Sequence, residues 1–306
     1  MGGYFGSVLQ AAAYNSSATA VQQLIDLGAG INVQGGKFGN ALQAAAFGNS
    51  KAAVQILIKH DANVNAQGGE YGTALQAAVY IGNTAIAELL IDLGAGVSVH
   101  GGKYGNALQA AVVMYHVAIV KLLVDRGADV NASTKDGEYG NALQAAASKG
   151  GCYMIQLLVD LGADVNAQGG RYGSALQAAV INGDTKTVYL LVDHGANVNA
   201  PGGEHGNALQ AAASEGDWEM IQLLVDLGAD VNARGGRYGD AFQAAVLSGE
   251  MEAVQLLLKL GADFNAQGGE YGNALQAARR NDDDAMVRLL VGFGANVNVP
   301  RVWEIP

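Results

Sequence analysis

Several residue types are scarce in this 306-residue sequence, which has one cysteine and three prolines, and in which 15% of the residues are charged. One cysteine cannot form an internal disulfide, so a disulfide-stapled secreted scaffold is excluded and a cytoplasmic or nuclear location is expected. The first residues, MGGYFGSVLQ, have no basic segment or apolar core, and nowhere do about 18 uncharged apolar residues follow one another. We therefore expect neither a signal peptide nor a membrane span.

Basic residues are also few: 17 Lys and Arg stand against 28 Asp and Glu, and the net charge is -11. They do not cluster. Because nucleic acids and anionic membrane surfaces attract clustered Lys and Arg, we expect neither as a partner. Half of the residues are apolar, which is enough for a large core and excludes a disordered chain.

A Leu-Gln-Ala-Ala segment recurs through the sequence. Its leucine, once replaced by phenylalanine, stands at Leu9, Leu42, Leu75, Leu108, Leu143, Leu176, Leu209, Phe242 and Leu275. The spacing is 33 residues except for one interval of 35, so nine repeats cover residues 2–300 and leave only the tail 301–306. The repeats are 2–34, 35–67, 68–100, 101–133, 134–168, 169–201, 202–234, 235–267 and 268–300. We therefore predict a single array over 1–306 with no separate domain.

Local signals predict two helices in each repeat. In the seventh repeat Asn207 is a good N-cap, and Gln210 completes a capping box, in which the glutamine side chain bonds back to the cap. Gly216 closes this helix, Asp217 caps a second one, and Gly228 ends it. A glycine-rich, turn-forming connection leads into the next repeat. Because one such helix pair cannot bury its apolar face alone, the repeats must stack into a solenoid.

The 33-residue period, the helix pair and the segment Val-x-Leu-Leu-hydrophobic-x-x-Gly-Ala-Asp-Val-Asn-Ala together resemble the ankyrin repeat over nearly the whole chain. Two departures recur: Asn-Ala-Leu-Gln replaces the family's Thr-Pro-Leu-His, and Gly-Gly-x-Tyr-Gly replaces its Asp-containing hairpin tip. This looks like the glycine-rich variant common in fungal proteins. The resemblance implies an all-α solenoid of nine stacked helix-turn-helix repeats with hairpin-like loops, which serves as a scaffold for a protein or peptide.

Fungal arrays of this kind often follow an NTPase signalling module, so the resemblance also implies an upstream signalling domain that these residues do not contain. No Gly-x-x-x-x-Gly-Lys-Ser/Thr loop occurs in the sequence. Polar residues such as Gln23 in the first repeat and Arg279 in the last replace apolar or neutral ones, as terminal caps do. We expect a complete array, with a fragment of a longer array as the alternative.

Two regular rows mark the hairpin tips. Charges alternate in sign along Lys37, Glu70, Lys103, Glu138, Arg171, Glu204, Arg237 and Glu270. One aromatic row, interrupted by a histidine, comprises Phe5, Phe38, Tyr71, Tyr104, Tyr139, Tyr172, His205, Tyr238 and Tyr271. We expect the charges to form exposed ion pairs between neighbouring tips, with a polar rim that steers a partner as the alternative. We expect the aromatic side chains to pack on the adjacent repeat, with a docking surface as the alternative.

The end of the first helix varies between repeats. It is apolar or aromatic in the first four repeats, whereas two later repeats have Ser148 with Lys149, and Ser214 with Glu215. The ankyrin resemblance places these positions on the concave face, and contiguous exposed apolar residues mark interaction sites. We predict a binding surface formed by Tyr14, Phe47, Tyr80, Ile81, Tyr104, Val113 and Met114. The alternative is that these side chains lie back on neighbouring helices.

Catalysis has little support. The five histidines are spread over different repeats without the spacing of metal ligands, and Cys152 has no partner motif, so we expect neither a metal site nor a cofactor. The alternative to a scaffold is a small-molecule-binding or catalytic groove in the more polar C-terminal half. It would use His205, which interrupts the aromatic row, with Glu204, Glu215 and Arg237 as titratable neighbours. An enzyme is the less favoured interpretation.

Overall fold

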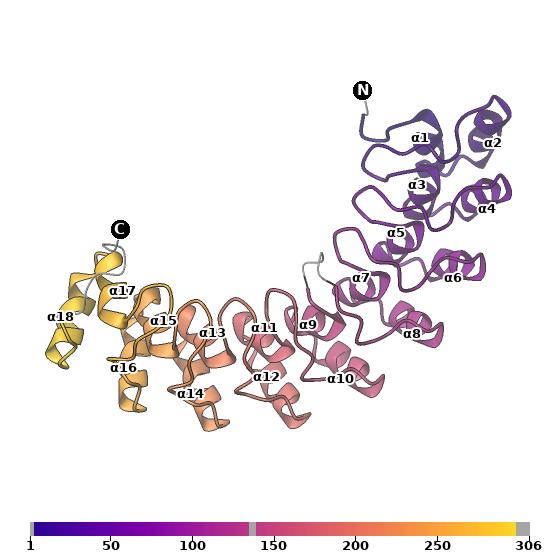
Figure 1. Cartoon of the computed structure of the whole chain (residues 1–306). Helices are drawn as coiled ribbons and strands as arrows, with labels where there is room; N and C mark the ends of the chain where they lie inside the picture. Colours follow the sequence, from indigo (N-terminus) through magenta and orange to yellow (C-terminus); the bar gives the residue numbers. More distant parts are fainter. Residues whose placement is uncertain (1–2, 135–138, 298–306) are drawn as a thin grey trace. The chain divides into compact units, whose positions relative to one another are not determined.

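The computed structural model describes residues 3–134 and 139–297. These two stretches contain eighteen α-helices and no β-strand, and Figure 1 labels the helices. The predicted all-α repeat array is confirmed, and the helix pairs are compatible with nine repeats. A search of the described residues finds no helix that is long and apolar enough to cross a membrane. Glu138 and the tail 301–306 lie outside the described residues.

Each repeat contributes a first and a second helix. The first helices are α1 (Val8–Tyr14), α3 (Ala41–Phe47), α5 (Ala74–Tyr80), α7 (Ala107–Val113), α9 (Ala142–Ala147), α11 (Ala175–Ile181), α13 (Ala208–Ser214), α15 (Ala241–Ser248) and α17 (Ala274–Arg280). The second helices are α2 (Ala18–Asp26), α4 (Lys51–Lys59), α6 (Thr84–Asp92), α8 (Val117–Asp125), α10 (Cys152–Asp160), α12 (Thr185–Asp193), α14 (Trp218–Asp226), α16 (Met251–Lys259) and α18 (Asp284–Gly292).

The chain divides into two compact units. The N-terminal unit comprises residues 1–145 and 156–163, and the C-terminal unit comprises residues 146–155 and 164–306. Within the N-terminal unit α1, α3, α5 and α7 pack in succession, and Figure 1 shows α2, α4, α6 and α8 as a second row beside them. Within the C-terminal unit α11, α13, α15 and α17 pack in succession in the same way.

Alanine fills the interfaces between successive first helices. The pair that follows the glutamine, such as Ala44 with Ala45 and Ala211 with Ala212, is buried in every repeat after the first. Because a methyl group is the whole side chain, neighbouring helices approach closely at these points. A larger residue would need space that a close-packed interior does not have.

The predicted N-caps of the first helices are confirmed. In every repeat the side-chain oxygen of the cap accepts a hydrogen bond from the backbone N–H of the glutamine three residues later, as from Gln210 to Asn207 at 2.8 Å. The caps are Ser7, Asn40, Thr73, Asn106, Asn141, Ser174, Asn207, Asp240 and Asn273. Asp217 caps the second helix of its repeat as predicted, because its carboxylate accepts from Met220 N at 2.9 Å.

The other half of the predicted capping box is wrong for Gln210, whereas in the eighth repeat Nε2 of Gln243 does donate to the cap Asp240, at 2.9 Å. Nε2 of Gln210 donates to the carbonyl oxygens of Ala233, Gly235 and Gly239, at 3.3, 3.1 and 3.3 Å, all in the connection that follows. Its Oε1 has no hydrogen-bond partner. The glutamine therefore ties one repeat to the next, because the connection turns several carbonyl groups towards it and an amide N–H₂ can donate to them.

The glycine-rich tips are one-bridge hairpins whose backbones touch. Gly68 N donates to Gly72 O at 2.9 Å within one tip, and Glu70 N donates to Lys37 O of the preceding tip at 2.8 Å. Gly72 has a φ of 88°, and a Cβ there would lie 2.9 Å from the backbone carbon of Gly101 in the following tip. Glycine is required at this position because of both the left-handed backbone and the close approach. The tips are therefore close enough for their side chains to stack.

Candidate functional site

Aromatic rings from the tips and from the first helices meet in the N-terminal unit. Phe38 of one tip lies between two helix rings, with centroids 5.1 Å from Tyr14 and 5.1 Å from Phe47. Phe47 in turn lies 4.8 Å from Tyr71 of the next tip. We call the continuous set the aromatic ladder; its members are Phe5, Tyr14, Phe38, Phe47, Tyr71, Tyr80 and Tyr104.

The two rows are columns of stacked rings. Phe5 and Phe38 stack at 5.9 Å, and Phe38 and Tyr71 at 6.2 Å. The helix rings of Tyr14 and Phe47 stack at 6.0 Å, and Phe47 continues to Tyr80 at the same separation. The predicted packing on the adjacent repeat is thus confirmed for the tip rings, and the same contacts join the tip row to the predicted binding surface.

Burial differs along the aromatic ladder. Phe38 and Tyr71 are buried, whereas Tyr14, Phe47 and Tyr80 are half-buried. The other predicted binding residues, Ile81, Tyr104, Val113 and Met114, are also half-buried. The helix rings therefore pack on neighbouring rings while part of their surface stays accessible.

Sequence reasoning missed Tyr4. It is 56% exposed, and its ring meets Phe5 and Phe38 edge-on at 4.9 and 5.6 Å. Nζ of Lys37 lies 5.6 Å from the centre of the Tyr4 ring. The signal was present, because Tyr4 occupies in the first repeat the tip position that carries alternating charges in the others.

Three pairs of neighbouring tips have the predicted ion pairs. Lys37 meets Glu70 at 3.4 Å, Arg171 meets Glu204 at 3.0 Å, and Arg237 meets Glu270 at 2.7 Å. All of these side chains are about one-third exposed or more, so solvent screens each pair and its contribution to stability is small.

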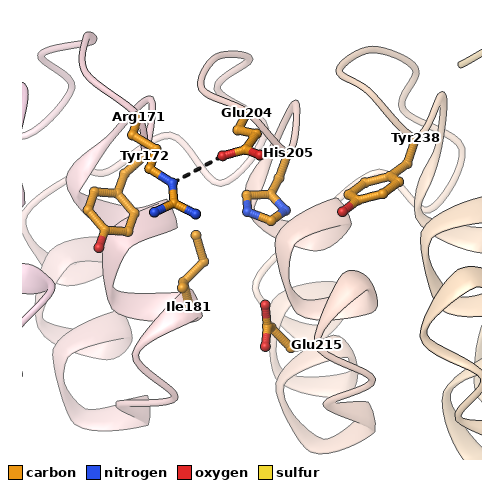
Figure 2. Close-up of a pocket in the computed structure, with 7 residues that line it drawn as sticks. All are labelled: Arg171, Tyr172, Ile181, Glu204, His205, Glu215 and Tyr238. Carbon is orange, nitrogen blue, oxygen red and sulfur yellow. Dashed lines mark hydrogen bonds and ion pairs between the residues drawn. The ribbon is translucent and has the colours of Figure 1, made fainter. Parts of the chain in front are cut away.

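A polar pocket of about 250 Å³ lies in the C-terminal unit and is shown in Figure 2. It is lined by Arg171, Tyr172, Ile181, Glu204, His205, Glu215 and Tyr238. The structure thus brings together three of the four residues of the catalytic alternative, His205, Glu204 and Glu215. Arg237 is directed to Glu270 instead, and Arg171, which sequence reasoning did not select, pairs with Glu204 at the pocket.

His205 is held by a serine rather than by Glu215. Its Nδ1 lies 3.0 Å from Oγ of Ser214, and that hydroxyl donates to Ala211 O at 2.8 Å. With the hydroxyl hydrogen directed to the carbonyl, the imidazole hydrogen is assigned to Nδ1 and Nε2 is assigned as the acceptor. Burial lowers the pKa of His205 below its usual 6.5, while Glu204 and Glu215 partly oppose this shift. His205 is therefore neutral at pH 7.

This arrangement restricts the chemistry. Ser214 is not activated as a nucleophile, because its hydrogen points to a backbone carbonyl and not to the imidazole. Nε2 of His205 can accept a proton or a hydrogen bond from a bound group. Across 3–134 and 139–297 no group of three His, Cys, Asp or Glu side chains is arranged to hold a metal ion. Sγ of Cys152, the one cysteine, lies within hydrogen-bond distance of a hydroxyl group, at 3.5 Å from Oγ1 of Thr187.

Comparisons with known proteins identify the family. No curated protein matches the chain. A family model described as ankyrin repeats (3 copies) matches residues 8–101, 99–169 and 143–235. These matches run without a break over more than half of the sequence and coincide with the observed helix pairs. The chain belongs to the ankyrin-repeat family.

Proposed function

We propose that this protein is a scaffold that binds a protein or peptide on the aromatic ladder and the adjoining residues Ile81, Val113 and Met114. Ankyrin repeats generally mediate protein–protein binding, and solenoids use extended surfaces for it. The observation that carries the proposal is the contiguous set of half-buried aromatic rings in one unit. Aromatic side chains dominate binding hot spots, because they bury a large area and lose little rotamer freedom.

The aromatic ladder is held in place before any partner arrives. Phe47 alone has four ring neighbours, Tyr14, Phe38, Tyr71 and Tyr80, at 4.8 to 6.0 Å. Rings fixed in this way lose little entropy on binding, so more of the contact energy becomes affinity. The exposed Lys37–Glu70 pair beside these rings supplies a polar rim, which favours orientation over raw affinity.

The proposal treats residues 2–300 as a single array of nine repeats. Its support is the unbroken 33-residue spacing, with one interval of 35, and the matching helix pairs. A cytoplasmic or nuclear location and the implied upstream signalling domain belong to the same proposal, and they rest on the single cysteine and on the fungal resemblance.

The experiment compares the proteins captured from cell extract by the intact chain and by a Phe47→Ala/Tyr80→Ala variant, followed by Kd measurements on each captured protein. We expect the double substitution to weaken binding at least about ten-fold, as loss of two hot-spot rings does. The matched control is Tyr153→Ala/Tyr189→Ala, which removes two exposed rings of second helices outside the aromatic ladder.

Circular dichroism separates lost binding from lost folding. Phe47→Leu keeps most of the buried volume while it removes the ring, and it should weaken binding without a change in helix content. A captured protein whose Kd is the same for intact chain and double variant contradicts the proposed surface.

The second candidate function is a small-molecule-binding or catalytic groove at His205. The observation in its favour is the pocket that joins His205 with Glu204 and Glu215. A thermal-shift screen of small molecules tests it. A compound that stabilises both the intact chain and the Phe47→Ala/Tyr80→Ala variant, but not His205→Gln, would establish this second function.

A further inference from the structure

Two residues that set the seventh repeat apart meet in the pocket of the C-terminal unit. His205 interrupts the aromatic row, and Glu215 is the one acidic residue at its position in the nine repeats. The corresponding residues elsewhere are Asn15, Gly48, Ile81, Met114, Lys149, Asn182, Ser248 and Asn281. His205 and Glu215 line the same pocket, and Figure 2 shows Tyr172 on one side of His205 and Tyr238 on the other. The repeat therefore departs from its neighbours where the pocket forms.

The charges that line the pocket leave one carboxylate uncompensated. Arg171 and Glu204 neutralise each other through the 3.0 Å contact between Nε and Oε2. Within the described residues Glu215 makes no ion pair. Glu215 is also the C-cap of α13, where the carbonyl end of the helix adds to the negative potential. The pocket therefore favours a cation.

The remaining walls suit a cation on an apolar stem. The rings of His205 and Tyr238 lie 6.0 Å apart, and Tyr172 and Ile181 complete the lining. A cation within about 6 Å of a tyrosine ring is attracted by its face. His205 does not repel it, because the neutral imidazole presents Nε2 as an acceptor.

The pocket is large enough for a single lysine or arginine side chain. About 250 Å³ is below the roughly 300–1,000 Å³ of pockets that enclose drug-sized ligands. The net charge of -11 would in addition attract a basic polypeptide over longer distances.

We propose that this pocket binds the side chain of a lysine or arginine carried by a bound polypeptide, with the Glu215 carboxylate as its counter-ion and the rings of Tyr172 and Tyr238 in its lining. This inference rests on the proposed function, because it places the cation on a protein or peptide partner. It identifies that partner as one with a basic segment.

The test uses the full chain and the probe peptide acetyl-Ala-Ala-Lys-Ala-Ala-amide, together with its arginine analogue. NMR titration should give saturable shifts of the His205 and Tyr238 ring signals with both peptides. A norleucine analogue has a similar apolar stem without the charge, and it should give none. Glu215→Gln should weaken binding of the lysine peptide about five-fold, the effect of a partly exposed ion pair.

The matched control is Glu219→Gln, which removes the same charge from an exposed position of α14 outside the pocket. Its Kd should stay within about two-fold of the intact chain, since separated surface charges are screened. Equal weakening by both variants would attribute the effect to net charge and overturn the assignment. Equal binding of the norleucine peptide, or no saturable shift with either basic peptide, would also overturn it.

These outcomes are distinct from failure of the proposed function. If partner capture depends on Phe47 and Tyr80 while the basic peptides do not bind, the scaffold function is supported and the proposed cation pocket is refuted. If the peptides bind at Glu215 while no partner depends on the aromatic ladder, the proposed aromatic surface is refuted and the cation pocket is supported.

Discussion

Single glutamines hold successive repeats together. Gln43 shows the same pattern as Gln210, because its Nε2 donates to Gly68 O at 3.0 Å and to Gly72 O at 2.7 Å. One side chain therefore serves several carbonyl groups that have lost contact with water. Without this donor, Gly68 O loses its bond from Gln43, whereas Gly72 O keeps its bond from Gly68 N. A buried carbonyl group that is left without a partner costs more than one ordinary hydrogen bond contributes.

We expect Gln210→Leu to lower the free energy of unfolding by about 1–3 kcal/mol, because Ala233 O and Gly235 O lose this donor, while Gly239 O keeps its bond from Gly235 N. Urea denaturation followed by circular dichroism measures this change. Gln222→Leu is the control, since the amide of Gln222 bonds only to the exposed Asp226. Equal effects of the two substitutions would show that the inter-repeat bonds do not stabilise the fold.

The ionisation of His205 gives a second prediction at this scale. Burial lowers the pKa of His205, and Glu215 partly raises it, so Glu215→Gln should lower the pKa further. The NMR signal of the imidazole Cε1–H against pH measures both values. A rise in pKa on Glu215→Gln would contradict the electrostatic account of the pocket.

The same shift sets a sign for stability. The unfolded chain binds a proton at the usual pKa of about 6.5, above the pKa of the folded state, so it takes up the proton first as the pH falls. Neutral His205 makes its full contribution to folding stability above the unfolded pKa of about 6.5, and this contribution is lost as the pH falls through the lower pKa of the folded state. His205→Gln should therefore flatten the dependence of stability on pH in this window.

Three second helices lack a side-chain cap, and one of them, α10, follows Gly151, which has no side chain. His116 at α8 and Glu250 at α16 make no cap hydrogen bond, whereas Asp217 at α14 does. Glutamate is one methylene longer than aspartate and does not belong to the preferred N-cap residues. The helix ends therefore differ in strength although the helices have equal length.

Glu250→Asp should stabilise the protein by about 0.5–1 kcal/mol, because the shorter carboxylate can accept from the first-turn N–H groups. Thermal unfolding should show a higher Tm. Glu252→Asp, inside the same helix, is the control and should give no gain, since aspartate is a poorer helix former. A Tm that does not rise with Glu250→Asp would contradict the assignment of the missing cap.

Local features of the elements could be predicted from sequence, and contacts between elements could not. The cap Asn207 and the end of α14 at Gly228 depend on residues a few positions away, so their signals are contained in one repeat. The targets of Gln210 lie 23 to 29 residues ahead and depend on how the next connection turns. The prediction of a bond back to the cap was wrong for that reason.

In the candidate sites, too, features within one repeat could be predicted from sequence, and contacts between neighbouring tips could not. His205 and Glu215 belong to one repeat, and the sequence grouped them only in the less favoured catalytic alternative, because His205 interrupts the aromatic row. Arg237 belongs to the next tip, where it is nearer to Glu270 than to the pocket, and Arg171 reaches the pocket from the preceding tip. Which tip a long side chain turns to depends on the spacing of the tips, which composition does not reveal.

At the scale of the whole molecule, the net charge of -11 should affect association with a partner more than dissociation from it. We expect the association rate constant of a captured basic partner to fall about ten-fold or more between low salt and about 0.5 M NaCl, because salt screens long-range attraction. Surface plasmon resonance measures both rate constants. An association rate that does not depend on salt would contradict electrostatic steering and a basic partner.

The alternating tip charges also limit how the gene can gain or lose repeats. Deletion of residues 202–234 would place Arg171 beside Arg237, whereas deletion of 202–267 would place Arg171 beside Glu270. Recombination between neighbouring repeats therefore creates a junction of like charges when it changes the copy number by an odd step, and preserves pairing when the step is even. A pair of repeats is therefore the smallest unit that can be duplicated or deleted without placing two like charges on neighbouring tips.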